Sequence, residues 1–468
     1  MAMTRNHILL AASLSISTTW IGSIGYVKPT NAVELVGRAV LPAATFAPGP
    51  TSGQLITGAN GQTPPFVSKQ PVQGFSAILL GPLPGTFLAM PDNGFGGKAN
   101  SPDALLRVYG IFPEFKTRFG GQGRVFAASP ITGQVLGRTF GKRSFIQLND
   151  KNSKLGFPII AEQSTYPTTT IPVDPQLQTG RWLTGGDLDI ESIRKGKDGT
   201  LWIGDEFGPF LVHTSASGEI LEPPISLPNF KGLGSNTLVQ SPDNPLLGSN
   251  TPNLARSKGF EGMALNTSRT KLYVMLEGPL TDDVDRSRLL INEFDLKTRK
   301  YTGRVFSYRM ENTTESGQAI GDLTAINDSE FLVIERDSLQ GDPQNPAFAN
   351  PAKFKRLYKI NLKKVDAQGF VKKELLVDLL NISDPHSVGD NGTTGGIFTF
   401  PFVTIEDVLP LDPFRVLIVN DNNFPFSVGR TPGVADNTEL IVVKLDNPLS
   451  LVPAPPTSWQ NYWRKHLR

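Results

Sequence analysis

Acidic residues recur at the ends of short apolar runs in this 468-residue chain. The run Leu201-Trp202-Ile203 stops at Asp205-Glu206, and another apolar run follows a Gly-Pro pair. Four further stretches repeat this unit of two apolar runs joined by a turn. A polar residue opens the first run of each unit (Ser76, Glu191, Glu261, Asp322, Glu406), and another follows the second run (Asp92, Asp205, Glu277, Glu335, Asp421).

Such units are typical of β-hairpins, in which the start of the first strand lies beside the end of the second. If the hairpins are arranged radially, their polar ends surround one mouth of a central channel. We expect metal ligands at Asp92, Glu191, Asp205, Glu261, Glu277, Asp322 and Asp421, and catalytic carboxylates at Glu191, Glu206 and Glu335.

Crowded carboxylates repel one another, so the cluster requires cations, protonation or screening by water. Calcium is the expected cofactor because it accepts six to eight oxygen ligands in flexible geometry. The alternative is ordinary turn chemistry, since Asp and Asn before Gly favour turns. Glutamate is a poor turn former, however, and the recurrence in five units favours a shared site.

Two arginines are candidates for binding an anionic substrate group. Arg336 follows Glu335 directly, and a guanidinium at that position could grip a phosphate or carboxylate, or simply pair with neighbouring acids. Arg304 is a weaker candidate for the same role. His213 and His386 are expected to be packed or surface residues rather than bases.

The absence of cysteine and the presence of only four histidines exclude thiolate zinc sites and nearly exclude three-histidine metal sites. No G-x-S-x-G elbow, phosphate-binding loop or dinucleotide fingerprint is present. Hard oxygen ligands therefore remain the means by which this chain could bind a metal.

The 46 glycines and 38 prolines, with 19% charged residues, are typical of many short strands joined by turns. We expect an all-β fold, a β-propeller of six or seven blades, with a possible sixth blade in residues 110–185. A pair of β-sandwiches is the alternative. Long proline-rich insertions interrupt the repeat at 150–184, 222–256 and 338–352.

Residues 1–32 resemble an export signal, with Arg5 before a short apolar segment and small residues near Ala32. An N-terminal membrane anchor is the alternative. Loss of this segment removes Arg5 and Lys28 and no acid, leaving 43 basic and 43 acidic side chains. We therefore expect an exported protein, periplasmic or extracellular, with no nucleic-acid partner and no stable membrane insertion after cleavage.

The expected organisation is a signal peptide (1–32), one propeller domain (33–455) and a solvated basic C-terminal tail (456–468). Two motifs, Asp189-Ile190-Glu191-Ser192-Ile193 and Leu201 to Pro209, resemble the phytase-like family, whose description is "esterase-like activity of phytase". Gly259 to Ala264 and Val333 to Asp337 are similar to its later motifs, and the resemblance runs from about residue 70 to 446.

The resemblance implies a β-propeller and hydrolysis of phosphate esters by a calcium-assisted mechanism, with acids holding the metal and Arg336 on the phosphate. Few lysines and arginines occupy the repeated positions, which favours a simple phosphate ester over a highly anionic substrate. Two alternatives stay open: a lactonase or carboxyl-ester hydrolase, and a non-catalytic propeller that binds a ligand and holds structural calcium.

Overall fold

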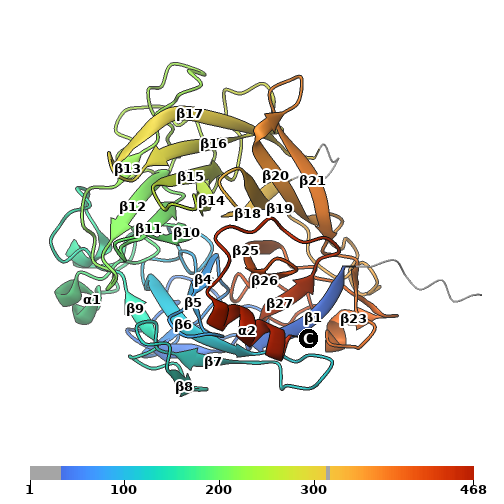
Figure 1. Cartoon of the computed structure of the whole chain (residues 1–468). Coiled ribbons are helices and arrows are strands. Elements are labelled where there is room, and N and C mark those ends of the chain that lie inside the picture. The colour runs from blue at the N-terminus through green and yellow to red at the C-terminus, as the bar shows by residue number, and fades with distance from the viewer. Residues whose placement is uncertain (1–32, 312–316, 468) are drawn as a thin grey trace, which may run out of the picture.

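Five antiparallel blades are arranged in a ring in the computed structural model, which describes residues 33–311 and 317–467 (Figure 1). Three blades are separate sheets, and the other two belong to one 13-stranded sheet. One strand from each blade lies innermost, and each innermost strand contacts the next around the ring. These strands are β4 (Ala77–Leu80), β10 (Ile190–Lys195), β14 (Phe260–Leu265), β18 (Ala319–Ala325) and β25 (Thr404–Asp412). The all-β propeller predicted from the repeats is therefore confirmed.

Three of the five blades are regular four-stranded sheets formed by consecutive strands. Blade 2 continues from β10 with β11 (Leu201–Asp205), β12 (Phe210–Thr214) and β13 (Ile225–Ser226). Blade 3 adds β15 (Lys271–Leu276), β16 (Arg288–Asp295) and β17 (Lys300–Arg309), and blade 4 adds β19 (Glu330–Arg336), β20 (Lys355–Val365) and β21 (Val371–Asp378).

Blade 5 closes the ring with a strand from the other end of the chain. Its strands β25, β26 (Arg415–Asp421) and β27 (Thr438–Lys444) are followed by β1 (Glu34–Leu41), which pairs antiparallel with β27. Backbone hydrogen bonds between the first and last strands of the ring therefore hold it shut.

Blade 1 shows why the ring has five blades rather than the six or seven predicted. It contains β4, β5 (Phe87–Met90), β6 (Arg107–Glu114), β7 (Arg124–Ala128), β8 (Val135–Gly137) and β9 (Phe145–Gln147). The first half of β6 pairs with β9 and its second half pairs with β7. Because one eight-residue strand accommodates both partners, the segment expected to form a sixth blade extends the first one instead.

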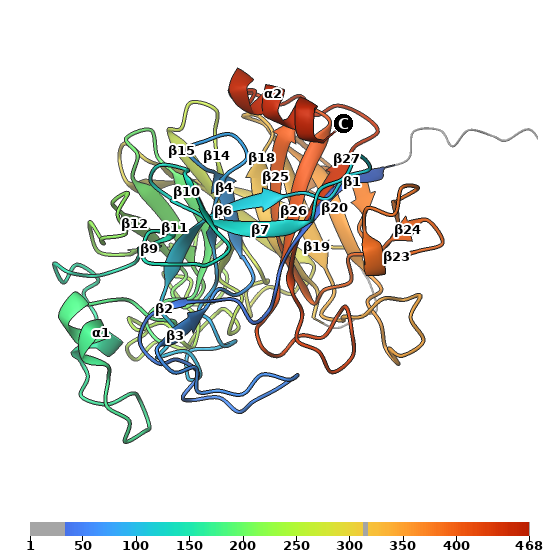
Figure 2. The same ribbon diagram turned by 90° about the horizontal axis from the view of Figure 1, so that it is seen from below.

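The loops between the blades contain short strands and helices. They are β2 (Phe46–Pro48), β3 (Lys69–Pro71), η1 (Ile160–Glu162), α1 (Pro175–Gly180), β22 (Ile382–Ser383), η2 (Asp390–Gly392), β23 (Thr393–Thr394) and β24 (Ile397–Phe398). Figure 2 shows β2, β3 and α1 on the side of the ring away from the C-terminal helix.

Apolar side chains fill the space between adjacent blades. Each of the five interfaces has its own cluster, for example Ile190 and Ile203 of blade 2 against Met90 of blade 1. Burial of this apolar surface is the main stabilising contribution to the fold. The strands can therefore hold their polar ends at fixed positions around the axis.

The C-terminal residues are packed against the propeller, which corrects the predicted solvated tail. Helix α2 (Thr457–His466) buries Trp459 and Trp463, and the Trp463 ring lies 5.8 Å from that of Phe87. The basic residues of the last turn occupy the other positions of the helix. Aromatic residues spaced four apart lie on one helix face, and that pattern outweighs the basic composition.

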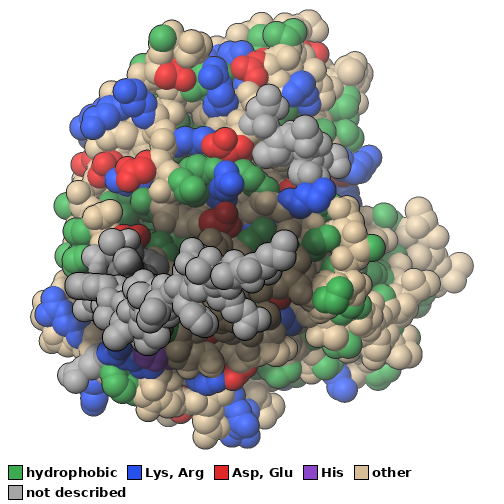
Figure 3. All heavy atoms as spheres, turned by 90° about the vertical axis from the view of Figure 1, so that its right-hand side faces the viewer, with side chains coloured by type: hydrophobic (Ala, Val, Ile, Leu, Met, Phe, Trp, Pro, Cys, Tyr) green, Lys and Arg blue, Asp and Glu red, His purple; other side chains and the backbone are tan. Residues whose placement is uncertain are grey.

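The segment 451–456, which leads into α2, lines a cavity of about 300 Å³ together with residues from all five innermost strands. This cavity lies at the end of the axis opposite the strand starts. On the face shown in Figure 3, basic and acidic side chains are interspersed. No helix among the described residues is long and apolar enough to cross a bilayer.

Candidate functional site

A β-bulge near the start of the first strand positions one group of site residues. In four blades the pairing of the first two strands skips one residue, namely Glu191, Glu261, Gly321 or Glu406. A bulged residue is left out of the ladder and its side chain is redirected. The carboxylates of Glu191, Glu261 and Glu406 consequently interact with one another near the axis.

The fourth blade has glycine at the bulge for a steric reason. A Cβ on Gly321 would lie 1.9 Å from the carbonyl oxygen of Ile405, which excludes every larger residue without a backbone shift. In blade 1 the matching position is Ser76, whose Oγ lies 3.1 Å from Glu406 Oε2. The five matching positions, one in each blade, therefore contribute three carboxylates, one hydroxyl and one glycine.

The second group follows the second strand of each blade. In four blades its member is the residue that follows the partner of the residue before the bulge, namely Glu206, Glu277, Arg336 or Asp421. In blade 1 it is Asp92, two positions after the last paired residue of β5. Together with the bulge residues, Asp189 and Lys258, they form what we call the axial cluster. Its eight carboxylates belong to Asp92, Asp189, Glu191, Glu206, Glu261, Glu277, Glu406 and Asp421.

Burial is the main reason why these carboxyl groups resist ionisation. It raises the pKa of Asp189, Glu191, Glu206, Glu261 and Asp421 well above the usual range, and neighbouring carboxylates raise it further. The same effect raises the pKa of Asp92 to about 6 and that of Glu406 to about 7. Without a cation, burial therefore favours the protonated forms of these carboxyl groups.

The cationic side chains of the cluster lie toward Glu277. Arg336 Nη2 lies 3.0 Å from Glu277 Oε1 and 3.4 Å from Glu406 Oε1, and Lys258 also pairs with Glu277. Nε of Arg336 is buried and has no hydrogen-bond partner in the described part of the chain. Arg336 therefore retains a donor that a substrate oxygen could accept.

Asp92, Asp189 and Glu191 form the part of the cluster best suited to a metal ion. One carboxylate oxygen from each lies within 4.8 Å of the others. Calcium ligands lie roughly 2.3–2.6 Å from the ion, so two ligands of one ion are at most about 5 Å apart. Asp189 Oδ1 and Glu191 Oε2 are buried without a hydrogen-bond partner among the described residues. Hard oxygen donors at this spacing fit calcium or magnesium.

The structure brings together most, but not all, of the residues predicted for the site. Asp92, Glu191, Glu206, Glu261, Glu277, Arg336 and Asp421 belong to the axial cluster. Asp205, Glu335, Asp322 and Arg304 do not, for reasons that differ between them.

Asp205 and Glu335 are each one residue too early in their strands. Asp205 accepts hydrogen bonds from the backbone N–H groups of Asp189 (2.8 Å) and Gly208 (2.7 Å), so it supports the loop that carries Asp189. Glu335 accepts from Tyr308 Oη at 2.5 Å and pairs with Lys373 at 2.9 Å, between blades 3 and 4. Successive residues in a strand point to opposite faces, which places both side chains off the axis.

Asp322 follows the bulged residue Gly321 in β18, and its carboxylate is engaged outside the axial cluster. It pairs with Arg194 at 3.2 Å, and Asp407 occupies the same register position in blade 5. Arg304 lies on outer strand β17 with an exposed side chain, where it pairs with Glu293 at 3.2 Å. Arg304 is therefore too far out in its blade to serve the axial site.

Three charged members of the cluster were missing from the predicted ligand and substrate-binding sets. Asp189 belongs to the alternating run Asp187-Leu188-Asp189-Ile190-Glu191, and that alternation was the available signal. Glu406 was recognisable as the opening residue of the fifth unit. No repeat marks Lys258. His213 is packed, as expected, since it stacks on Trp202 with 4.1 Å between ring centroids.

The fold and site define a β-propeller whose axis holds a buried, mostly acidic cluster. A family model described as "Phytase-like: Esterase-like activity of phytase" matches residues 70–424, which include every member of this cluster. The chain belongs to this phytase-like family. The resemblance found in the repeat motifs is thereby confirmed.

A curated relative from Arthroderma benhamiae is described as an uncharacterized secreted protein. It is 26% identical over 205 residues, which are 37% of this chain and 39% of the relative. The matched part thus spans well under half of the relative's length. Its secretion agrees with the predicted export; the expected signal, residues 1–32, lies outside the described residues.

Solved structures resemble the chain only distantly. An endo-arabinanase from Bacillus licheniformis is 10% identical with a TM-score of 0.34, covering 78% of this chain and 93% of its own. A protein of unknown function from Dyadobacter fermentans is 10% identical with a TM-score of 0.34, covering 88% and 99%. A luciferin-regenerating enzyme is 10% identical with a TM-score of 0.32, covering 82% and 97%.

Proposed function

We propose that this protein is an exported hydrolase that cleaves phosphate esters at the axial cluster with the help of a calcium ion. Family membership supports the hydrolase class, and the secreted relative supports export. The observation that carries the proposal is the asymmetry of the cluster: cationic side chains pair with Glu277 and Glu406, while Asp92, Asp189 and Glu191 converge without such a partner.

Asp92, Asp189 and Glu191 would hold the calcium ion. The unpaired oxygens of Asp189 and Glu191 are costly to bury unless a cation or a proton compensates them. Calcium supplies Lewis-acid polarisation of a phosphoryl group and neutralises its charge. Two further carboxyl groups interact with these residues, Glu261 with Glu191 and Asp421 with Asp92.

Arg336 would orient the substrate. Glu277 and Glu406 fix its guanidinium through Nη2, and this leaves Nε to donate to a phosphoryl oxygen. With a cation held by Asp92, Asp189 and Glu191, the guanidinium would supply a second positive charge, which would favour an anionic phosphate over a neutral ester.

Glu206 is the residue best suited to donate a proton to the leaving oxygen. Burial and the neighbouring Glu277 raise its pKa well above the usual range, which favours the protonated form of the carboxyl group. Its Oε1 has no hydrogen-bond partner in the described part of the chain. A carboxylic acid kept neutral in this way can act as a general acid.

The proposal is tested by assaying the purified protein on 4-nitrophenyl phosphate and 4-nitrophenyl butyrate, with calcium and with EDTA. Calcium-dependent phosphate release that is lost in Glu191→Gln, and kept in the surface control Glu374→Gln, is the expected result. Turnover of the butyrate alone would replace the proposal by a carboxyl-ester hydrolase. Folded protein that turns over neither compound would favour a binding propeller.

A further inference from the structure

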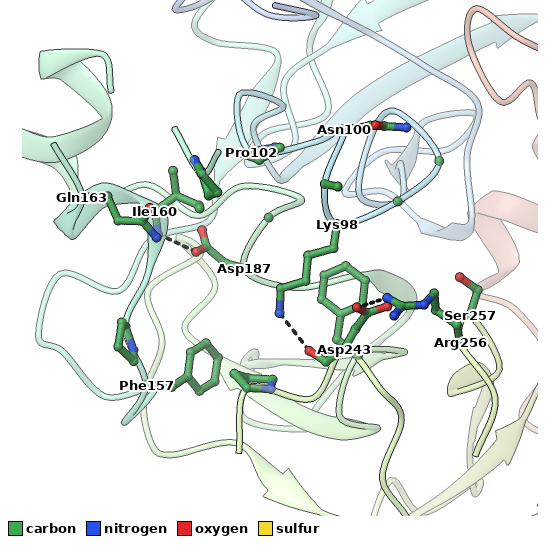
Figure 4. A pocket seen from close by; sticks show the side chains of 18 residues that line it. Lys98, Asn100, Pro102, Phe157, Ile160, Gln163, Asp187, Asp243, Arg256 and Ser257 are labelled. Atoms are coloured by element: carbon green, nitrogen blue, oxygen red, sulfur yellow. Dashed lines mark hydrogen bonds and ion pairs between the residues drawn. The ribbon is translucent and has the colours of Figure 1, made fainter. Parts of the chain in front are cut away.

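A second pocket lies beside the axial cluster. It has a volume of about 430 Å³ and is formed by the loops containing residues 96–102, 157–167 and 243–257 (Figure 4). Phe157, Ile160 and Phe207 contribute apolar surface, together with several prolines. Small-molecule sites typically measure roughly 300–1,000 Å³ and combine apolar walls with a few polar groups. The pocket therefore has the size and lining of such a site.

Lys98 is the principal polar group available to a ligand in this pocket. Its Nζ donates to the backbone carbonyl of Asp243 at 2.8 Å and lies 5.0 Å from the centre of the Phe207 ring. Figure 4 shows Lys98 extending between Asp187 and Asp243. An ammonium group has three donors, so this single hydrogen bond leaves two for a ligand.

The nearby acidic side chains are already engaged. The carboxylate of Asp243 pairs with Arg256, and Asp187 accepts from the backbone N–H groups of Ile160 (2.7 Å) and Thr184 (2.8 Å). Among the described residues Lys98 forms no ion pair, although Asp243, Asp205 and Asp187 act on it at longer range. Burial lowers the pKa of Lys98 because its charge is only partly compensated. An anionic ligand would supply the missing partner.

Two residues that line the pocket, Asp187 and Phe207, are close in sequence to members of the axial cluster. Phe207 follows Glu206, and Asp187 precedes Asp189 by two residues. Asp205, which acts on Lys98, holds the backbone of Asp189 by a 2.8 Å hydrogen bond. A ligand bound here would therefore lie next to the residues that would cleave it.

We propose that this pocket binds the non-reacting part of the substrate, and that its ligands are organic anions with an apolar ring or branched body and one charged group held by Lys98. The inference rests on the proposed function only for the statement that the ester bond then reaches the axial cluster. Binding in the pocket itself requires neither metal nor turnover.

The test is calorimetric titration of the full protein with 2-naphthoate in the presence of EDTA, with the neutral 2-naphthamide as a control ligand. We expect Lys98→Met to weaken naphthoate binding about tenfold, the effect of losing one hydrogen bond to a charged group, and to leave naphthamide unchanged. Lys197→Met, at an exposed turn, should change neither.

A second pair of variants tests whether a bulky side chain in the pocket blocks binding. Ala99 lines the pocket with an exposed side chain, so Ala99→Trp should block both ligands without disturbing the core. Ala255→Trp adds the same ring to an exposed residue that does not line the pocket, and should block neither.

Absence of naphthoate binding at millimolar concentration, or equal binding by wild type and Lys98→Met, would overturn the inference. Hydrolysis of methyl phosphate tests the proposed function without testing the pocket, because this substrate has no apolar group to fill the pocket. Loss of naphthoate binding with intact methyl phosphate hydrolysis refutes only the inference. Naphthoate binding without hydrolysis of any ester refutes only the proposed function.

Discussion

Arg336 Nη2 lies 3.0 Å from Glu277 Oε1, and the two residues occupy the same position in adjacent blades. The propeller repeat thus places an arginine where its other four blades place a carboxylate. This single change of charge gives the cluster its polarity, because Glu277 and Glu406 are both paired with the arginine.

Replacement of Arg336 by leucine should destabilise the metal-free protein strongly. The change leaves Glu277 and Glu406 without their partner, and breaking a buried ion pair costs about 3–5 kcal/mol. Chemical denaturation at neutral pH measures the loss. Arg304→Leu, which removes an exposed arginine, should change stability by no more than about 0.5 kcal/mol. Equal effects of the two changes would show that Arg336 does not hold the cluster together.

The metal-free protein should become less stable as the pH rises from about 4.5 toward 7. The pKa of Glu406 is raised from 4.5 to about 7 and that of Asp92 from 3.8 to about 6. Between the unfolded and folded pKa values the native state binds more protons than the unfolded state, so unfolding becomes easier as protons are removed. Thermal denaturation in EDTA across this range tests the sign; a melting temperature that climbs steadily from pH 4.5 to 7 would contradict it.

Calcium should reverse this loss of stability, and the effect should depend on Asp189 and Glu191. A ligand at 100 times its dissociation constant stabilises the native state by about 2.7 kcal/mol. We expect Asp189→Asn and Glu191→Gln to abolish most of the calcium-induced rise in melting temperature. Asp407→Asn is the matched control, because Asp407 is a buried carboxylate outside the three converging oxygens. A calcium response that survives in both ligand variants would remove these residues from the site.

Glu206→Gln should lower kcat without changing the calcium response. The substitution keeps the shape of a neutral carboxyl group but removes the proton that it would donate, and general acid catalysis contributes about 10²- to 10⁴-fold. The alkaline limb of the pH–rate profile should disappear with it. If the variant instead bound calcium more weakly but had an unchanged kcat when saturated with calcium, Glu206 would be a metal ligand rather than the general acid.

The repeats in the sequence predict the fold class and most of the cluster, but not which residues of the first and second strands meet at the axis. The predicted pairs of polar residues are 13 to 16 residues apart, whereas the positions that meet in the structure are 15 or 16 apart in every blade. The observed pairs are Ser76 and Asp92, Glu191 and Glu206, Glu261 and Glu277, Gly321 and Arg336, and Glu406 and Asp421.

Three misleading acids account for the shift. Asp205 and Glu335 stand directly before the axial residues Glu206 and Arg336, and Asp322 stands directly after the bulged Gly321. The bulges added a further uncertainty, because a skipped residue changes which side chains face the axis. A requirement for a similar spacing in every blade would have corrected these assignments. Helix α2 is a separate case: the spacing of Trp459 and Trp463 predicts a packed helix, whereas the basic composition suggested a solvated tail.

The proposed chemistry depends on a divalent cation held by Asp92, Asp189 and Glu191. A crystal structure of the protein grown with calcium would show whether the ion binds there. We expect density for one ion bound by carboxylate oxygens of all three residues at about 2.4 Å. A structure at millimolar calcium in which the three carboxyl groups contact only one another and water would contradict it.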